Sequence, residues 1–288
     1  MPKATVKEGD EKVNSNRRAA KIIGVLFIFA AVTAIIGLIL YDPILNGPNY
    51  LTNGSKHANQ VIIGALMELI LVISAIGTST ILFPILRKYN ETIALWHVCF
   101  RFLEAVIITV GVISVLSLLT LSQEFVATAT QDAASFQASG TVLKAIHDWT
   151  FLLGPNIMLG INTMMYSYIF YRSKLVARFI PILGMIGATL VFIAGLLEMF
   201  DIFSQLSVWG AILSLPVAAN EMILAVWLIV KGFSESALTS LDEKRKSRDS
   251  CEHIVSLVRN CIYTNDNFKC IKSLAFLQAF LFMQNTFK

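Results

Sequence analysis

The apolar stretch at residues 94–121 carries three ionisable side chains at helical spacing. His97, Arg101 and Glu104 stand at positions i, i+4 and i+7, which places them on one face of an α-helix. Ionisable groups inside such a stretch are costly to bury, so they are candidates for a functional site. Two interpretations stay open, a site that handles charge and an ion pair that only ties helices together.

Further polar positions interrupt two other apolar stretches. Glu68 lies in one of them, and Asn220 with Glu221 lies one turn after Pro216 in the other. Proline has no N–H, so a carbonyl of the preceding turn loses its helical partner. The predicted charge site consists of Arg101, Glu104, Glu221, Asn220 and Glu68.

The charges of this site do not balance. Three carboxyls, those of Glu68, Glu104 and Glu221, face one obligatory cation, Arg101. An unpaired carboxylate in an apolar medium costs several kcal/mol, so it takes up a proton or is joined by a cation. We therefore expect at least one of these glutamates to hold a proton at neutral pH or to meet water.

A second group of polar residues is predicted near the outer end of the helices. It contains His147, Asp148 and Glu198. An aspartate beside a histidine can orient the imidazole for proton transfer. The alternative is that the pair anchors a helix end beside Trp149 at the membrane interface.

The amino-acid composition indicates that these apolar stretches lie in a membrane. Of the 288 residues, 56% are hydrophobic and 15% are charged, against roughly 45 to 50% and about 25% in soluble proteins. A soluble fold is therefore excluded. Helices need about 20 apolar residues to span a bilayer, and six stretches qualify: 22–40, 61–86, 94–121, 146–171, 179–200 and 207–230.

These stretches predict an all-α, polytopic membrane bundle of six transmembrane helices. Continuous apolar runs lack the alternation of barrel strands, and helices satisfy their own backbone groups in lipid. Lys and Arg concentrate in the tails and in alternate connections, which places both termini in the cytoplasm. At 1.5 Å per residue, Glu104 and Glu221 lie about 15 Å deep, near the midplane.

The chain is expected to have three parts. Residues 1–21 form a cytoplasmic tail, 22–231 form the six-helix membrane domain, and 232–288 form a second cytoplasmic tail that is partly disordered. The last part is polar at first and contains the apolar run 271–283. That run is too short to span a bilayer but could lie on the membrane surface.

Three segments resemble one known family. They are 100–105, which reads FRFLEA, 147–155, which reads HDWTFLLGP, and 171–184, which begins YRSKLV. They resemble the bacterial multi-pass membrane proteins grouped as domain of unknown function 4386, over about residues 17–232. Ala177 and the tail beyond residue 250 depart from the pattern. The resemblance implies six helices in a bacterial cytoplasmic membrane and supplies no reaction.

Several chemistries find no support in the sequence. The two histidines within the spans, His97 and His147, lie near opposite membrane faces, so they cannot hold a haem together. Zinc-protease, nucleophile-elbow and phosphate-loop motifs do not occur. We expect no cofactor, no metal and no nucleic-acid partner, and the lipid bilayer with a proton or small cation as the partners.

Three functions follow from these residues. The first is a small proton- or cation-coupled transporter, or permease, built on the charge site. The second is a non-catalytic regulatory or interaction subunit whose charges position helices. The third is a lipid- or quinone-modifying enzyme that uses the outer group together with Glu68. The sequence favours a protein that is not an enzyme, and it does not indicate the oligomeric state.

The charge imbalance is directly testable by infrared titration of the purified protein. We expect a protonated carboxyl band at neutral pH, because one cation cannot neutralise three carboxylates in an apolar interior. The band should disappear when the responsible residue among Glu68, Glu104 and Glu221 is replaced by glutamine. If no single replacement changes the spectrum, the predicted imbalance is wrong.

Overall fold

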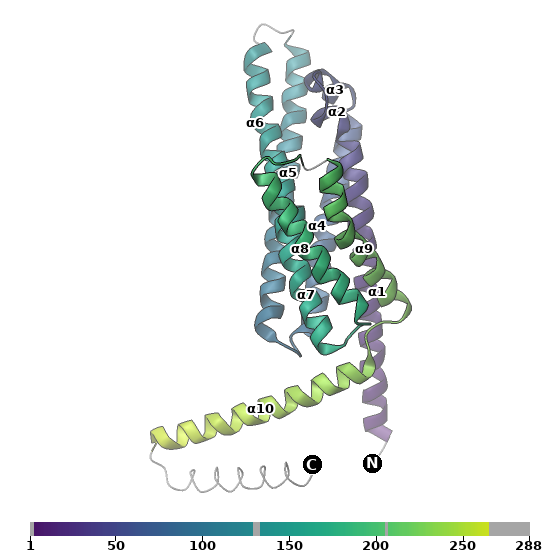
Figure 1. The fold of residues 1–288 in the computed structure, drawn as a ribbon, viewed down its shortest axis with the longest axis vertical. Coiled ribbons are helices and arrows are strands. Elements are labelled where there is room, and N and C mark those ends of the chain that lie inside the picture. Colours follow the sequence, from purple (N-terminus) through teal and green to yellow (C-terminus); the bar gives the residue numbers. More distant parts are fainter. Residues whose placement is uncertain (1–2, 129–132, 205–206, 265–288) are drawn as a thin grey trace. The chain divides into compact units, whose positions relative to one another are not determined.

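The computed structural model describes residues 3–128, 133–204 and 207–264 of the chain, and all regular structure in these ranges is helical (Figure 1). The expected all-α class is confirmed for this part of the chain. The elements are α1 (Lys3–Leu40), α2 (Asp42–Leu45), α3 (Tyr50–Lys56), α4 (Ala58–Leu86), α5 (Glu91–Ala127), α6 (Ala133–Leu152), the π-helix η1 (Leu153–Met158), α7 (Leu159–Ser173), α8 (Phe179–Met199), α9 (Val208–Val230) and α10 (Glu235–Thr264).

Five of the described helices are long and apolar enough to cross a membrane. They are residues Val13–Leu40 of α1 and the whole of α4, α5, α8 and α9. Each corresponds to one of the apolar stretches expected from the sequence. The chain is accordingly a multi-pass membrane protein with an apolar helical bundle.

The remaining expected span, residues 146–171, is not one α-helix. It is divided among the end of α6, the π-helix η1 and most of α7. Pro155 lies inside η1 and has no N–H to donate to the preceding turn. In a regular α-helix its ring would also collide with the carbonyl of the residue four positions earlier. A wider π turn forms there instead. The stretch expected to form this span therefore consists of three consecutive helical segments.

The long helices of the unit that ends at Ala237 close into a ring. Helix α1 packs against α4 and α9, and α4 packs against α5. Helix α5 contacts α6, η1 and α7, after which α7 contacts α8 and α8 contacts α9 (Figure 1). Every helix of the ring therefore packs against at least two others, and the ring surrounds the interior in which the candidate site lies.

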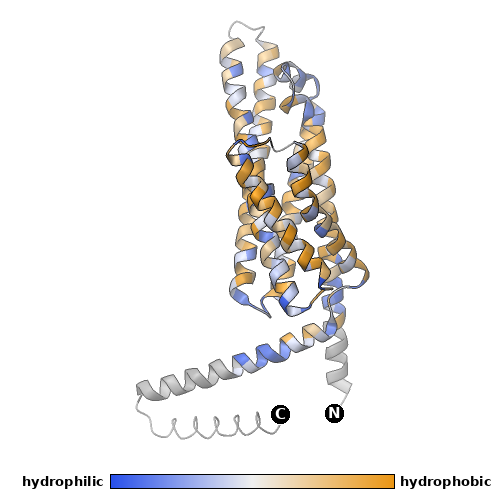
Figure 2. Ribbon diagram, in the orientation of Figure 1, coloured by the Kyte–Doolittle hydropathy of each residue, from blue (hydrophilic) through white to orange (hydrophobic). Residues whose placement is uncertain are grey.

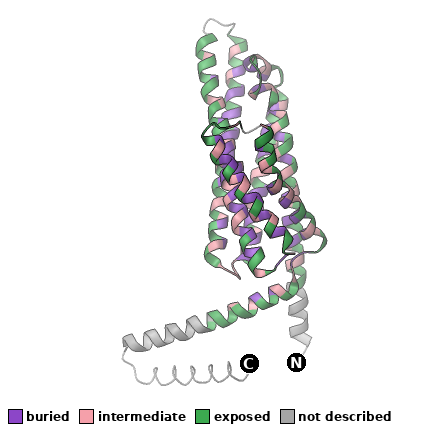
Figure 3. Cartoon of the chain, in the orientation of Figure 1, coloured by how far each residue is buried: buried purple, intermediate pink, exposed green. Residues whose placement is uncertain are grey.

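The outside of the bundle is apolar, and the interior contains polar as well as apolar side chains. Apolar residues run along α8 and α9 in Figure 2, and many of them are exposed in Figure 3. Ile73 and Leu215 are 68% and 66% exposed, whereas Asn162, Thr163 and Ser167 are completely buried. A soluble protein rarely shows such a large apolar surface. This distribution is consistent with contact between the helices and lipid.

The end of the bundle that contains Tyr41, which the Lys and Arg pattern predicts to be the outer end, has helices in the connections between its long helices. The expected connection at 41–60 contains α2 and α3, and the one at 122–145 continues α5 to Ala127 and α6 from Ala133. Residues of these elements share a core whose buried members include Tyr41, Ile44, Val115 and Leu118. These helices therefore cover the outer ends of α4 and α5 with packed side chains.

The chain divides into two units between Ala237 and Leu238, inside α10. Helix α10 extends to Thr264 and occupies much of the polar tail expected at 232–288. The apolar run 271–283 lies outside the described residues, so its interfacial helix stays a prediction.

Glycines allow the closest approaches between neighbouring helices of the ring. A Cβ atom on Gly187 of α8 would lie 2.6 Å from the backbone nitrogen of Val217 and 2.9 Å from the carbonyl carbon of Pro216, both in α9. Backbone atoms cannot move aside without displacing the helix. At Gly77 the nearest atom is instead the end of the Leu26 side chain, at 3.0 Å.

This difference predicts unequal effects of two matched substitutions. Gly187→Ala should lower stability by about 1 to 3 kcal/mol, because the added methyl group forces α8 and α9 apart. Gly77→Ala should have a smaller effect, since the Leu26 side chain can change rotamer. Thermal unfolding of the purified protein in detergent measures both, and equal melting temperatures for the two variants would contradict the packing described here.

Candidate functional site

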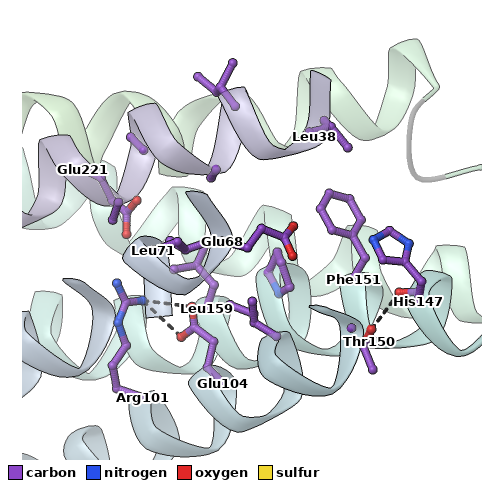
Figure 4. Close-up of a pocket in the computed structure, with 17 residues that line it drawn as sticks. Leu38, Glu68, Leu71, Arg101, Glu104, His147, Thr150, Phe151, Leu159 and Glu221 are labelled. Atoms are coloured by element: carbon purple, nitrogen blue, oxygen red, sulfur yellow. Dashed lines mark hydrogen bonds and ion pairs between the residues drawn. The ribbon is translucent and has the colours of Figure 1, made fainter. Parts of the chain in front are cut away.

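A cavity of about 230 Å³ lies inside the ring and brings together residues from most of its helices (Figure 4). Five ionisable side chains line it, those of Glu68, Arg101, Glu104, His147 and Glu221. The remaining lining residues are Ala30, Ala31, Ala34, Ile35, Leu38, Leu71, Ile108, Gly111, Thr150, Phe151, Pro155 and Leu159.

Arg101 and Glu104 form an ion pair on one face of α5. Nη1 of Arg101 donates to both carboxylate oxygens of Glu104, each at 3.1 Å. Both side chains are about 5% exposed. Nε of Arg101 also donates to the carbonyl oxygen of Ala75 in α4, at 3.4 Å. The i, i+3 spacing read from the sequence therefore corresponds to a direct, buried contact.

Asn162 of α7 completes the surroundings of Glu104. Its Nδ2 donates to Oε2 of Glu104 at 2.6 Å, and the asparagine is fully buried. The carboxylate thus accepts hydrogen bonds from a guanidinium and an amide, which buried charges require. Helical spacing could not pair Asn162 with Glu104, because the two residues are 58 positions apart.

Glu221 reaches the same cavity from α9. Its Oε1 atom is buried and has no hydrogen-bond partner among the described residues. Arg101 acts on it electrostatically as an opposite charge and Glu104 as a like charge. Since Arg101 already bonds to Glu104, Glu221 lacks a cationic partner of its own.

Glu68 enters the cavity from α4, and it is 8% exposed. Its Oε2 accepts a long hydrogen bond, 3.4 Å, from the hydroxyl of Tyr41. Tyr41 follows α1 at the outer end, where burial and the neighbouring Glu68 raise its pKa. The hydroxyl therefore keeps its proton and remains a donor. The sequence did not predict this role for Tyr41.

Asn220 belongs to a neighbouring buried network. It is fully buried, and its Nδ2 donates to the hydroxyl of Tyr166 at 3.2 Å. The ring of His97 packs edge-on against Tyr166 with centroids 5.8 Å apart. Neither Asn220 nor His97 is among the described residues that line the cavity. Both contact Tyr166 instead.

The three residues of the predicted outer group are not brought together. His147 lines the cavity and stacks on Phe151, with ring centroids 6.1 Å apart. Asp148 lies 3.4 Å from Nδ1 of His147, but its side chain is 70% exposed. Glu198 accepts a 2.6 Å hydrogen bond from Asn156 of η1 and does not line the cavity. His147 instead shares the cavity with Glu68.

The cavity therefore contains more acidic groups than cations. Glu104 and Arg101 neutralise each other, and the described lining contains no second Lys or Arg that could pair with Glu68 or Glu221. Figure 4 places the Glu68 carboxyl between the Arg101–Glu104 pair and the side chains of His147 and Phe151. In the described residues no group of three or more His, Cys, Asp or Glu has the geometry of a metal site.

A comparison with protein families agrees with this architecture. The family model described as a domain of unknown function, DUF4386, matches residues 22–232. The chain belongs to this family, and the match covers the whole ring of helices that surrounds the cavity. No curated protein and no solved structure matches the chain.

The ion pair predicts a characteristic pattern of stability. Arg101→Leu should destabilise the protein by about 3 to 5 kcal/mol, because Glu104 would be left as a buried charge without its cation. Adding Glu104→Gln to that variant should recover much of the loss, since the charge is then removed as well. Thermal unfolding in detergent measures both effects.

Arg18→Leu is the matched control, because Arg18 is exposed. A loss as large in this control, or no recovery in the double variant, would show that Arg101 and Glu104 do not act as a pair.

Proposed function

We propose that the protein is a small proton- or cation-coupled permease of a bacterial cytoplasmic membrane. In this proposal α6, η1 and α7 together make one broken span, so the chain crosses the bilayer six times with both termini in the cytoplasm. The Lys and Arg residues of the tails and alternate connections support that orientation. Residues 22–231 form the transport domain, and the flanking tails stay outside the membrane.

The charge imbalance inside the cavity carries this proposal. Glu68, which is 8% exposed, and Glu221, whose Oε1 atom is buried, share a cavity with a cation that already bonds to Glu104. In an apolar interior each of them needs a proton or a cation to be stable. A group that exchanges one positive species for another on the two sides of a membrane is what ion-coupled transport requires.

The residues have distinct roles in this mechanism. Arg101 fixes the carboxylate of Glu104 and keeps the centre of the cavity polar. Glu221 on α9 and Glu68 on α4 are the exchangeable acids, and they lie on different helices of the ring. Motion of α9 relative to α4 would therefore change the separation of the two acids and their tendency to hold a proton.

The broken span gives further support. Transporters often place their sites where a membrane helix is interrupted, and π segments recur at functional sites. Pro155 of η1 and Leu159, the first residue of α7, both line the cavity. The irregular part of the bundle thus lies beside the acids.

A second candidate is a non-catalytic regulatory or interaction subunit. The observation in its favour is the tie formed by Arg101, Glu104 and Asn162, which joins α5 to α7 and, through the Ala75 carbonyl, to α4. In that case the charges stabilise the bundle and move no solute. The two candidates differ in whether Glu221 can be replaced without loss of flux.

Proton flux into proteoliposomes tests the proposal. Vesicles that enclose a pH-sensitive dye and carry a K⁺ diffusion potential or an Na⁺ gradient should change internal pH faster with the protein than without it. Glu221→Gln should slow this flux about tenfold or more, because the amide cannot release a proton. Glu124→Gln is the matched control, since Glu124 lies on the exposed surface of α5.

Two results would overturn the proposal. One is an internal pH that changes no faster than in protein-free vesicles under either gradient. The other is a Glu221→Gln variant that is as fast as the wild type, which would leave the second candidate as the better account.

A further inference from the structure

We propose that the cavity binds a protonated primary amine with a compact apolar body, such as a phenylalkyl ammonium ion. This inference rests on the proposed function only in placing the substrate at the same cavity. It names the chemical class of the substrate, whereas the proposed function names only the coupled positive species.

The unsatisfied acid defines the head of the ligand. Oε1 of Glu221 is buried without a hydrogen-bond partner among the described residues, and such an atom costs free energy until a donor reaches it. A primary ammonium offers both the positive charge that Glu221 lacks and three N–H donors. A quaternary ammonium offers only the charge, and a neutral alcohol offers only a donor.

The second acid strengthens this assignment. Glu68 accepts a long, 3.4 Å hydrogen bond from Tyr41, and Tyr41 carries no charge to balance it. Both acids line one cavity, and neither is paired with a Lys or Arg among the described lining residues. One ammonium ion in this cavity reduces the excess of negative charge that both acids create.

The walls define the body of the ligand. Besides the acids, the cavity is lined by Ala31, Ala34 and Leu38 of α1, by Phe151 of α6 and by Leu159 of α7. Water gains little at such a surface, whereas an apolar group gains about 25 cal/mol for each Å² it buries. The cavity therefore favours a cation that carries apolar surface over a hydrated metal ion.

The arrangement of these groups suits a ligand with two different ends. Figure 4 places Glu221 beside the Arg101–Glu104 pair at one end, and the rings of Phe151 and His147 at the other. An aromatic body can pack against Phe151 while the ammonium lies between the acids. Glu104 offsets the charge of Arg101, so the attraction of Glu221 and Glu68 for the head is not opposed by an unpaired cation.

The volume limits the size of the ligand. A cavity of 150 Å³ holds benzene, with its six non-hydrogen atoms, so about 230 Å³ corresponds to roughly nine such atoms. Phenethylamine has this size and is protonated at neutral pH, as alkyl amines are. Its neutral isostere 2-phenylethanol has the same shape and lacks the charge.

Binding should also release a proton. If Glu221 holds a proton in the empty cavity, the arriving ammonium replaces it, so that a carboxylic acid and an ammonium ion give a carboxylate–ammonium pair and one free proton. Charge is conserved in this exchange. It supplies the link between substrate and proton that the proposed permease requires.

Calorimetric titration of the full chain in nanodiscs tests the inference, with empty nanodiscs as the blank. Phenethylammonium should bind about tenfold or more tightly than 2-phenylethanol, because a charge-assisted hydrogen bond is lost with the alcohol. Titration in two buffers of different ionisation enthalpy should reveal the released proton. Equal binding of the two probes, or binding of neither, overturns the inference.

Variants locate the site. Glu221→Gln should weaken phenethylammonium binding about tenfold and abolish the proton release, while leaving 2-phenylethanol binding unchanged. Ala34→Leu should weaken both probes by filling the cavity without touching an acid. Ala218→Leu, at an exposed position of α9, is the matched control.

Melting temperatures show whether each variant is folded. A folded Glu221→Gln or Ala34→Leu variant that binds like the wild type contradicts the assignment.

The two proposals fail separately. Amine binding with no flux in proteoliposomes overturns the permease and leaves the binding site. Proton flux driven by Na⁺ or K⁺ without amine binding overturns this inference and leaves the permease.

Discussion

The buried ion pair between Arg101 and Glu104 is the interaction on which the rest of the interior depends. A guanidinium cannot lose its proton in a protein, so it must have an anion beside it when it is buried. Asn162 and the carbonyl of Ala75 supply the remaining hydrogen bonds and fasten three helices around the pair. The pair engages the one guanidinium that lines the described cavity, so Arg101 acts on Glu221 as an opposite charge while its ion-pair partner is Glu104.

The bundle accommodates this polar centre by burying polar side chains in its interior and exposing apolar side chains on its outside. Many large aliphatic side chains are exposed on the outside, where lipid replaces water, while the buried residues, purple in Figure 3, include hydroxyl and amide groups among apolar side chains. Small residues of α1 leave free space beside the acids, since Ala30, Ala31 and Ala34 fill less volume than the leucines and isoleucines around them. Helices α4, α5 and α9 thus supply the acidic side chains and the arginine of the cavity, and the small residues of α1 provide much of its free volume.

The sequence predicted local features better than distant contacts. Hydropathy located five membrane-length helices, and helical spacing placed Arg101 beside Glu104, because both signals depend on near neighbours in the chain. Asn162 and Tyr41 could not be assigned, since their contacts with Glu104 and Glu68 depend on how separate helices pack. From its position in the sequence, His147 was predicted to lie in an outer group apart from the charge site. In the structure His147 lines the same cavity as Glu68, Arg101, Glu104 and Glu221.

The π-helix η1 has a geometric consequence for the wall of that cavity. His147, Phe151, Pro155 and Leu159 follow one another at intervals of four and all contribute to the lining. In regular α-helix each interval overshoots a 3.6-residue turn by about 40°, so the fourth position would lie about 120° away from the first. The larger π turn winds this drift back. A sequence change that restored α-helical winding at Pro155 would therefore rotate α7 about its own axis and carry Asn162 away from the carboxylate it holds.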